Sequence, residues 1–222
     1  MPVDRDSLAF SPDGRTWTPT RRVLNDGEWL WRLTWHEGRA YGVSYRAMDP
    51  GKDWTATLYS TADGLEYERI TVLDVPNQPN ETTLRFLPDG TMIALVRREA
   101  GNRRAWIGTS RKPYTQWTWK ETEHQIGGPN FIILPAGAMW AAGRSYPGEI
   151  KTVLARFGLD GYEPVLTLPS RTDTSYPGLV WHDGLLWMSY YSSHEGKTSI
   201  YLARVRLPTD AATSAPASIS PR

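Results

Sequence analysis

Two arginines and two tyrosines occupy matching places in this sequence. Each lies seven residues after the glycine of a short turn, and the four positions are Tyr45, Arg97, Arg144 and Tyr191. A planar guanidinium group binds a carboxylate through two parallel hydrogen bonds and stays charged at any physiological pH. Two arginines in matching positions therefore predict a site for an acidic ligand, provided that the surrounding elements bring both to one place.

The turn glycines recur at a nearly constant period. Neighbours in one series are 47 to 52 residues apart, and its members are Gly38, Gly90, Gly137 and Gly184. A second series lies between them and consists of Gly14, Gly64 and Gly161, with Lys112-Pro113-Tyr114 in place of a missing member. The flanking runs are rich in Val, Ile, Thr, Tyr and Trp, which is typical of antiparallel hairpins. Two hairpin turns per period mean four strands per repeat, the content of a β-propeller blade.

This repeat predicts an all-β protein, a β-propeller of four-stranded blades over residues 1–207. We label the strands of a blade a to d from the axis outward. Complete blades are expected over 28–75, 81–124 and 128–168, with only strands c and d over 7–23 and only strands a to c over 175–207. Because both ends carry a c strand, the pattern favours a six-bladed propeller that is incomplete at its N-terminus. The alternative is a five-bladed ring with an irregular closing blade. Residues 208–222, mostly Ala, Ser, Thr and Pro, are expected to be disordered.

The composition excludes several classes of function. The formal net charge is +1, from 25 basic and 24 acidic side chains, so no broad positive field is available for nucleic acid. The chain has no cysteine, which excludes disulfides and thiol catalysis, and its four histidines lie far apart. We therefore predict neither a metal site nor a cofactor. The longest apolar runs are far shorter than a membrane span.

The same topology places further polar side chains near the arginines. Strand a begins where strand b ends, so residues just before a and just after b gather at one end of the propeller, which we call the mouth. Near the start of strand a, successive blades carry Glu81, Asn130 and Tyr176. The residues expected to line the mouth are therefore Glu81, Asn130, Tyr176, Arg97, Arg144 and Tyr191.

Two hairpins carry a more specific pattern. The segment Ser11-Pro12-Asp13-Gly14-Arg15-Thr16-Trp17 resembles an Asp-box, the S-x-D-x-G-x-T-W hairpin, with one residue deleted, and 60–67 is a degenerate copy with Tyr67 in the Trp position. We expect the Asp side chain to fold onto the turn amides and the Trp to pack under the hairpin. Asp-box (BNR) repeats occur in several propeller families, where they stabilise the fold. Together with the order of the mouth residues, they make the chain similar to the sialidase (neuraminidase) superfamily.

The resemblance implies roles for single residues. In that family a Tyr–Glu pair supplies the nucleophile and three arginines hold the carboxylate of sialic acid. By that resemblance Tyr176 is the nucleophile, Glu81 is its base, and Arg97 and Arg144 belong to the clamp, with Asn130 and Tyr191 beside the substrate. The third arginine and the acid/base Asp are expected upstream of Ser7; within the chain, Asp49 and Asp53 are the first candidates for the acid. Removal of either arginine is expected to weaken binding while leaving folding intact, and Arg98, which points to the other face of its strand, is the control.

Several alternatives remain open. Tyr176 is also explained by packing, Arg97 as a rim charge, and Arg144 as the partner of a loop carboxylate such as Glu149. The leading function is an exo-acting, sialidase-like glycoside hydrolase with an acidic glycan as its partner. The alternatives are a non-catalytic glycan-binding propeller and another propeller glycosidase that acts on a neutral or uronic sugar. The resemblance fits a secreted or periplasmic protein, but no signal peptide precedes Ser7, so the compartment and the oligomeric state stay open.

Overall fold

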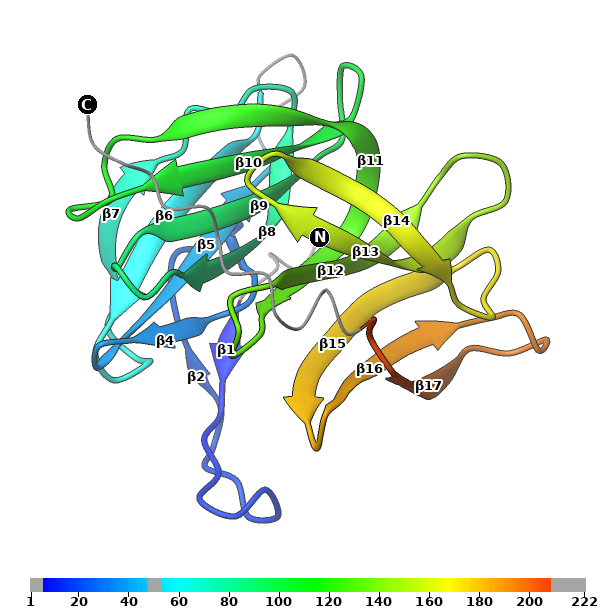
Figure 1. Cartoon of the computed structure of the whole chain (residues 1–222). Coiled ribbons are helices and arrows are strands. Elements are labelled where there is room, and N and C mark those ends of the chain that lie inside the picture. Colours follow the sequence, from blue (N-terminus) through cyan, green and yellow to red (C-terminus); the bar gives the residue numbers. More distant parts are fainter. Residues whose placement is uncertain (1–5, 48–52, 209–222) are drawn as a thin grey trace. The chain divides into compact units, whose positions relative to one another are not determined.

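The computed structural model describes residues 6–47 and 53–208, and the regular structure of these residues consists entirely of β-strands. Wherever a strand register is given, the pairing is antiparallel. Figure 1 shows the strands in sequence colours. The chain divides into two compact units, Met1–Trp119 and Lys120–Arg222. Within the described ranges, no helix is long and apolar enough to cross a membrane.

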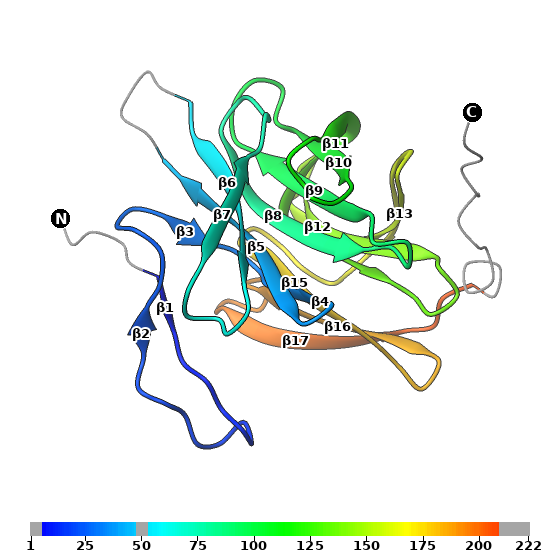
Figure 2. The same ribbon diagram turned by 90° about the vertical axis from the view of Figure 1, so that its left-hand side faces the viewer.

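Unit 1 contains two larger sheets and a small strand pair. The first sheet has the order β3-β5-β6-β7, with β4 also paired to β5, and Figure 2 shows β5, β6 and β7 side by side. Its strands are β3 (Trp29–Leu30), β4 (Thr34–His36), β5 (Arg39–Arg46), β6 (Thr55–Thr61) and β7 (Glu68–Val72). The small pair consists of β1 (Ser7–Leu8) and β2 (Arg21–Arg22).

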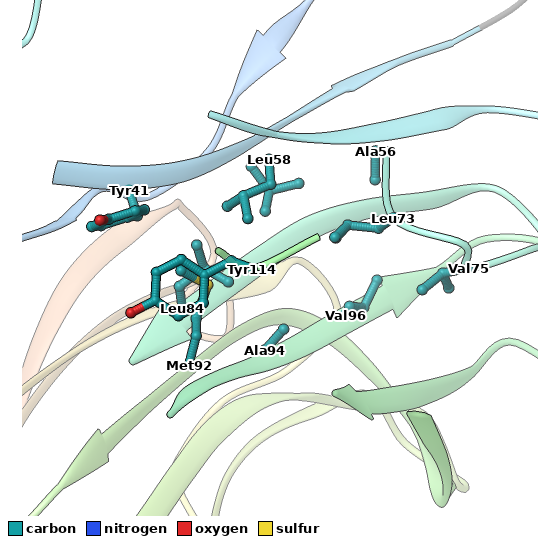
Figure 3. Close-up of a cluster of buried hydrophobic side chains, with 11 residues drawn as sticks. Tyr41, Ala56, Leu58, Leu73, Val75, Leu84, Met92, Ala94, Val96 and Tyr114 are labelled. Atoms are coloured by element: carbon teal, nitrogen blue, oxygen red, sulfur yellow. The ribbon is translucent and has the colours of Figure 1, made fainter. Parts of the chain in front are cut away.

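The second sheet of unit 1 follows β7 in the sequence. Its strands are β8 (Pro79–Phe86), β9 (Met92–Arg98), β10 (Arg104–Ser110) and the beginning of β11 (Thr118–Ile133), which continues into unit 2. The apolar face of this sheet packs against β5 and β6, as Figure 3 shows for Leu58, Leu84 and Met92, each of them fully buried. This packing fixes the ends of β5, β6, β8 and β9 relative to one another. Those ends carry the predicted site residues of unit 1.

Unit 2 repeats the arrangement. The rest of β11 is followed by β12 (Met139–Ser145), β13 (Lys151–Gly158) and β14 (Gly161–Thr167). A separate sheet contains β15 (Thr174–His182), β16 (Leu185–Ser192) and β17 (Ser199–Val205). A core that includes Trp140, Leu154, Leu186 and Met188 joins the two sheets. Strands β12 and β15 are thereby held against each other.

A bulge occurs near the start of β8 and of β15, and in the second half of β11. The register shifts between Pro79 and Thr82 in β8, between Gly127 and Asn130 in β11, and between Ser175 and Gly178 in β15. A bulge leaves residues unpaired and turns their side chains away from the regular alternation. Glu81, Asn130 and Tyr176 all lie within or at the edge of these bulges, at different positions in each, so they are not equivalent residues of a strict repeat.

Several sequence predictions can be compared with these sheets. The all-β, antiparallel architecture is confirmed. The strands largely lie within the predicted blade ranges, but β8 to β14 form one seven-stranded sheet where we expected two separate blades over 81–124 and 128–168. One difference is β11, which is a single continuous strand where we expected a break between 124 and 128. The blade count and the single domain over 1–207 stay predictions. The disordered tail predicted for 208–222 lies, from 209 onward, outside the described residues.

The Asp-box hairpin has the predicted backbone chemistry but not the predicted packing. Asp13 Oδ1 accepts hydrogen bonds from the amides of Arg15 and Thr16, both at 2.8 Å, and Asp63 acts in the same way on the second copy. Trp17, however, is 63% exposed, so the expectation that it packs under the hairpin is wrong. The hairpin is held by the Asp side chain and by Thr18, whose hydroxyl accepts a hydrogen bond from the Phe10 amide.

Candidate functional site

In unit 1 the predicted residues Glu81 and Arg97 form an ion pair that is largely shielded from solvent. Arg97 Nη1 donates to Glu81 Oε2 over 2.5 Å, and Arg97 Nη2 contacts Glu99 Oε1. The exposed fractions of the side chains are 13% for Arg97, 6% for Glu81 and 26% for Glu99. One guanidinium group therefore holds two carboxylates at the point where β8 begins and β9 ends.

Arg98 points to the other face of β9, as alternation predicts. Its Nε donates to the carbonyl of Arg104 at 2.8 Å, its Nη2 bonds Asn102, and its guanidinium lies 5.0 Å from the ring centre of Trp106. Only 2% of Arg98 is exposed. The proposed use of Arg98→Ala as a neutral control is therefore wrong, because that change would remove a buried, fully engaged side chain.

In unit 2 Arg144 has a comparable set of partners. Its Nε donates to the carbonyl of Thr174 at 2.7 Å, its Nη2 donates to the Tyr191 hydroxyl at 3.0 Å, and Asp173 Oδ1 lies 3.5 Å away. Glu149, the partner considered from the sequence, instead contacts Lys151 and Arg171, each at 3.0 Å. Arg144 thus links the end of β12 to the start of β15.

Tyr191 lies between Arg144 and Asp173. Its hydroxyl donates to Asp173 Oδ1 over 2.5 Å. Burial, together with the hydrogen bond to the Asp173 carboxylate, raises the pKa of Tyr191 to about 12. The phenol therefore stays protonated at neutral pH and acts as a hydrogen-bond donor.

Tyr176, the predicted nucleophile, is 44% exposed and has a left-handed backbone with φ of 51°. Its ring lies 5.6 Å from that of Tyr191, at an angle of 50°. A Cβ atom on Gly128 would come within 2.5 Å of Tyr176 Cδ1, so the ring rests directly on the glycine backbone. Non-glycine residues with a left-handed backbone cluster at active sites and ligand clamps.

Asn130 ties two neighbouring strands of unit 2 together. Its Nδ2 donates to the carbonyl of Pro177 at 2.8 Å, and the residue is only 3% exposed. Ser175 makes a parallel contact, because its hydroxyl donates to the carbonyl of Gly127 at 2.9 Å. Both bonds hold the bulges of β11 and β15 together, which places Asn130 in a positioning role beside Tyr176.

The structure therefore brings the predicted residues together in two groups. Glu81 and Arg97 meet in unit 1, whereas Arg144, Tyr176, Tyr191 and Asn130 gather in unit 2. A Tyr176–Glu81 pair and a joint arginine clamp would require groups from both units, so both stay predictions.

Two carboxylates of these groups were missed from the sequence. Glu99 contacts Arg97 and Asp173 contacts Arg144. A signal was present for each: Glu99 follows Arg97 by two residues, and Asp173 directly precedes the Thr-Ser-Tyr start of β15.

Asp53, one of the two in-chain candidates for an acid, has a structural role. Its carboxylate accepts hydrogen bonds from the amides of Asn77 at 2.7 Å, Gln78 at 2.6 Å and Trp54 at 2.9 Å. Asn77 and Gln78 both have positive φ values. The hydrogen bonds from their amides to Asp53 stabilise this tight turn before β8. Asp49, the other candidate, lies outside the described residues.

Comparison with known proteins adds the fold to this geometry. No family model and no curated protein sequence matches the chain. Among solved structures, the chain is similar to a protein of unknown function from Dyadobacter fermentans, with a TM-score of 0.78 and 16% identity over 91% of this chain. It is also similar to an endo-1,4-β-xylanase from Bacteroides thetaiotaomicron (TM-score 0.57, 11% identity, 80% of this chain). A third similar structure is a GH32 β-fructofuranosidase from Bombyx mori (TM-score 0.60, 11% identity, 92% of this chain).

The chain spans 64%, 68% and 54% of the lengths of those three proteins. At identities of 11 to 16% these likenesses establish the fold alone, which is a β-propeller, the fold of the xylanase and the β-fructofuranosidase. The propeller part of the sequence prediction is therefore supported, whereas the sialidase resemblance gains no support from these neighbours.

Proposed function

We propose that this chain acts on carbohydrate, as part of a propeller-type glycoside hydrolase whose substrate is a neutral sugar. The observation that carries the proposal is the pair of carboxylates, Glu81 and Glu99, on the single guanidinium group of Arg97. Glycoside hydrolysis commonly needs two carboxyl groups, one to protonate the leaving oxygen and one to act as base or nucleophile. The fold, which is that of known propeller glycosidases, supports the same function.

The two carboxylates differ in their access to solvent. Glu99 has 26% of its side chain exposed and Glu81 only 6%. Glu99 is therefore the carboxylate that we assign to first contact with a sugar. Arg97 keeps both groups in a fixed orientation, which is what positioned proton transfer requires.

The charges of the two arginines favour a neutral sugar over an acidic one. Arg97 already contacts Glu81 and Glu99, and Arg144 lies near Asp173. The carboxylate of an acidic sugar would compete with these partners for the arginines. At Arg97 it would have to displace Glu81, whose side chain is only 6% exposed, and separating a buried carboxylate from its arginine costs free energy. A neutral sugar requires no such exchange.

The sialidase version of the proposal rests on a different observation, the contact of Tyr176 and Arg144 with Tyr191 in unit 2. It keeps Tyr176 as nucleophile, Glu81 as base and both arginines as the clamp. It predicts turnover of a sialoside that is lost in Tyr176→Phe.

Hydrolysis of a panel of aryl glycosides tests these versions. The panel contains a xyloside, a galactoside, an arabinofuranoside and a sialoside, and the variants are Glu81→Gln and Glu99→Gln. Glu66→Gln is the control, because Glu66 is exposed and lies in the Asp63 turn between β6 and β7. We expect turnover of a neutral glycoside, reduced about 10²- to 10⁴-fold by either site variant and unchanged by the control.

Other outcomes decide between the alternatives. Turnover confined to the sialoside would support the Tyr176 version. Binding of sugars without any turnover would make the chain a glycan-binding propeller. If no member of the panel is bound or cleaved, the proposal is wrong.

A further inference from the structure

Three aromatic rings form a row at the same end of unit 1 as the Glu81–Arg97 pair. We call Trp29, Tyr45 and Trp54 the aromatic row. The centres of the Trp29 and Tyr45 rings are 6.2 Å apart with planes 18° from parallel, and those of Tyr45 and Trp54 are 6.1 Å apart at 7°. Trp29 is 46% exposed, so solvent reaches the end of the row.

The row is built on paired strands. Trp29 in β3 is directly opposite Tyr45 in β5, so both side chains project from the same face of the sheet. Trp54 directly precedes β6, whose first residues pair with the end of β5. The alignment of the three rings thus follows from strand pairing.

Asp53 anchors the row to the neighbouring sheet. Its carboxylate accepts from the amide of Trp54 and also from the amides of Asn77 and Gln78, which precede β8. The strand that follows this turn carries Glu81. Asp53 therefore holds the backbone of Trp54 in place before any ligand arrives, and a preorganised surface loses little entropy on binding.

The aromatic row, in which Trp29 is exposed and Tyr45 and Trp54 are partly buried, suits one class of ligand. The face of an aromatic ring is electron-rich and attracts the weakly positive C–H groups of a flat, uncharged pyranose ring, but not a carboxylate. Tyr and Trp also combine an apolar surface with a polar atom that can meet a sugar hydroxyl. We propose that the aromatic row is a subsite for the neutral pyranose rings of an oligosaccharide, an inference that rests on the proposed function and names its substrate class.

Binding measurements on the whole chain test this subsite. The probes are the hexaoses of β-1,4-linked xylose, glucose and mannose and of β-1,3-linked galactose, with sialyllactose as the acidic probe. Calorimetry and intrinsic tryptophan fluorescence follow the titrations. The test variant is Trp29→Ala, and the matched control is Trp35→Ala, because Trp35 is 58% exposed and pairs with Ala40 at the opposite end of β5.

We expect at least one neutral hexaose to bind and sialyllactose to bind more weakly. Trp29→Ala should weaken the association of that hexaose about tenfold and remove most of the fluorescence change, while Trp35→Ala leaves both unchanged. Thermal unfolding of both variants checks the fold, and Trp29→Phe, which keeps an aromatic face, should restore most of the affinity.

Four results would overturn the inference. One is equal affinity of Trp29→Ala and Trp35→Ala for the hexaose. The second is absence of binding of every neutral hexaose at about 10 mM. The third is sialyllactose binding as tightly as the neutral hexaose. The fourth is self-association of the chain that Trp29→Ala abolishes, which would make the row a protein contact.

If Glu81→Gln lowers turnover while Trp29→Ala does not change hexaose binding, the proposed function stands and the subsite falls. If neither turnover nor sugar binding occurs, both are wrong.

Discussion

Arg97 Nη1 and Glu81 Oε2 are 2.5 Å apart, in a pair whose side chains are only 13% and 6% exposed. Removal of Arg97 takes the guanidinium group away from Glu81 and Glu99 together, and the enclosed Glu81 carboxylate loses this opposite charge. The sequence-based expectation that folding survives the loss of Arg97 unchanged therefore needs revision, because this arginine also supports the fold.

Arg97→Met should lower the free energy of unfolding by about 3 to 5 kcal/mol, whereas the double change Arg97→Met with Glu81→Leu should recover much of the loss. Urea denaturation measures both. Arg39→Met is the control, since Arg39 contacts Glu68 at 2.6 Å in an exposed pair that is expected to contribute no more than about 1 kcal/mol. Equal losses for Arg97→Met and Arg39→Met would contradict this view of the pair.

Gly128→Ala should destabilise unit 2 and displace Tyr176. The added Cβ would lie 2.3 Å from Ser175 Oγ and 2.5 Å from Tyr176 Cδ1, and φ is +57°. Gly148→Ala is the control that measures the cost of a positive φ without a steric clash, because Gly148 has φ of +69° and nothing within 4 Å of its Cβ position. We expect a loss of about 1 kcal/mol for Gly148→Ala and about 3 kcal/mol for Gly128→Ala in urea denaturation. A smaller effect at Gly128 than at Gly148 would show that the Tyr176 ring moves away at no cost.

Tyr191→Phe should change how stability depends on alkaline pH. The folded-state pKa of Tyr191 is raised to about 12, so its contribution to stability is fully present below the unfolded-state pKa of about 10 and is lost as pH rises toward 12. Between these values Tyr191→Phe should lose less stability than the native chain, as followed by urea denaturation at several pH values. At neutral pH the variant should be about 1 kcal/mol less stable, because the bonds to Asp173 and Arg144 are gone. Parallel pH curves for the two proteins would rule out a raised Tyr191 pKa.

The hairpin around Asp13 should open in acid. Hydrogen bonds from the amides of Thr16 and Arg15 lower the pKa of Asp13 to about 2. Its contribution is therefore complete above the unfolded-state value of about 3.9 and is lost as pH falls through the folded-state value. The amide NMR shifts of Arg15 and Thr16 should move in that window, and the same amides in Asp13→Asn should not titrate. An unchanged titration in Asp13→Asn would assign the transition to another group.

Local sequence patterns predicted the positions of the strands and the hydrogen bonds of the Asp13 turn. The spacing of turn glycines and the alternation of β-branched and aromatic residues were sufficient to group the strands, because hairpin turns and a two-residue period are local properties. Alternation also placed Arg97 and Arg98 on opposite faces of β9. The turn bonds of Asp13 followed from four consecutive residues.

The partners of the charged side chains were decided only by the tertiary structure. Arg144 lies near Asp173 instead of Glu149, because the packing of β12 against β15 brings a residue 29 positions away closer than one five positions away. The exposure of Trp17 and the burial of Arg98 also depend on which elements cover them. Such contacts join segments that are distant in the chain. Residue type and spacing predicted which side chains lie at the strand ends that carry Arg97 and Arg144. The packing of the sheets determined which of these side chains contact one another.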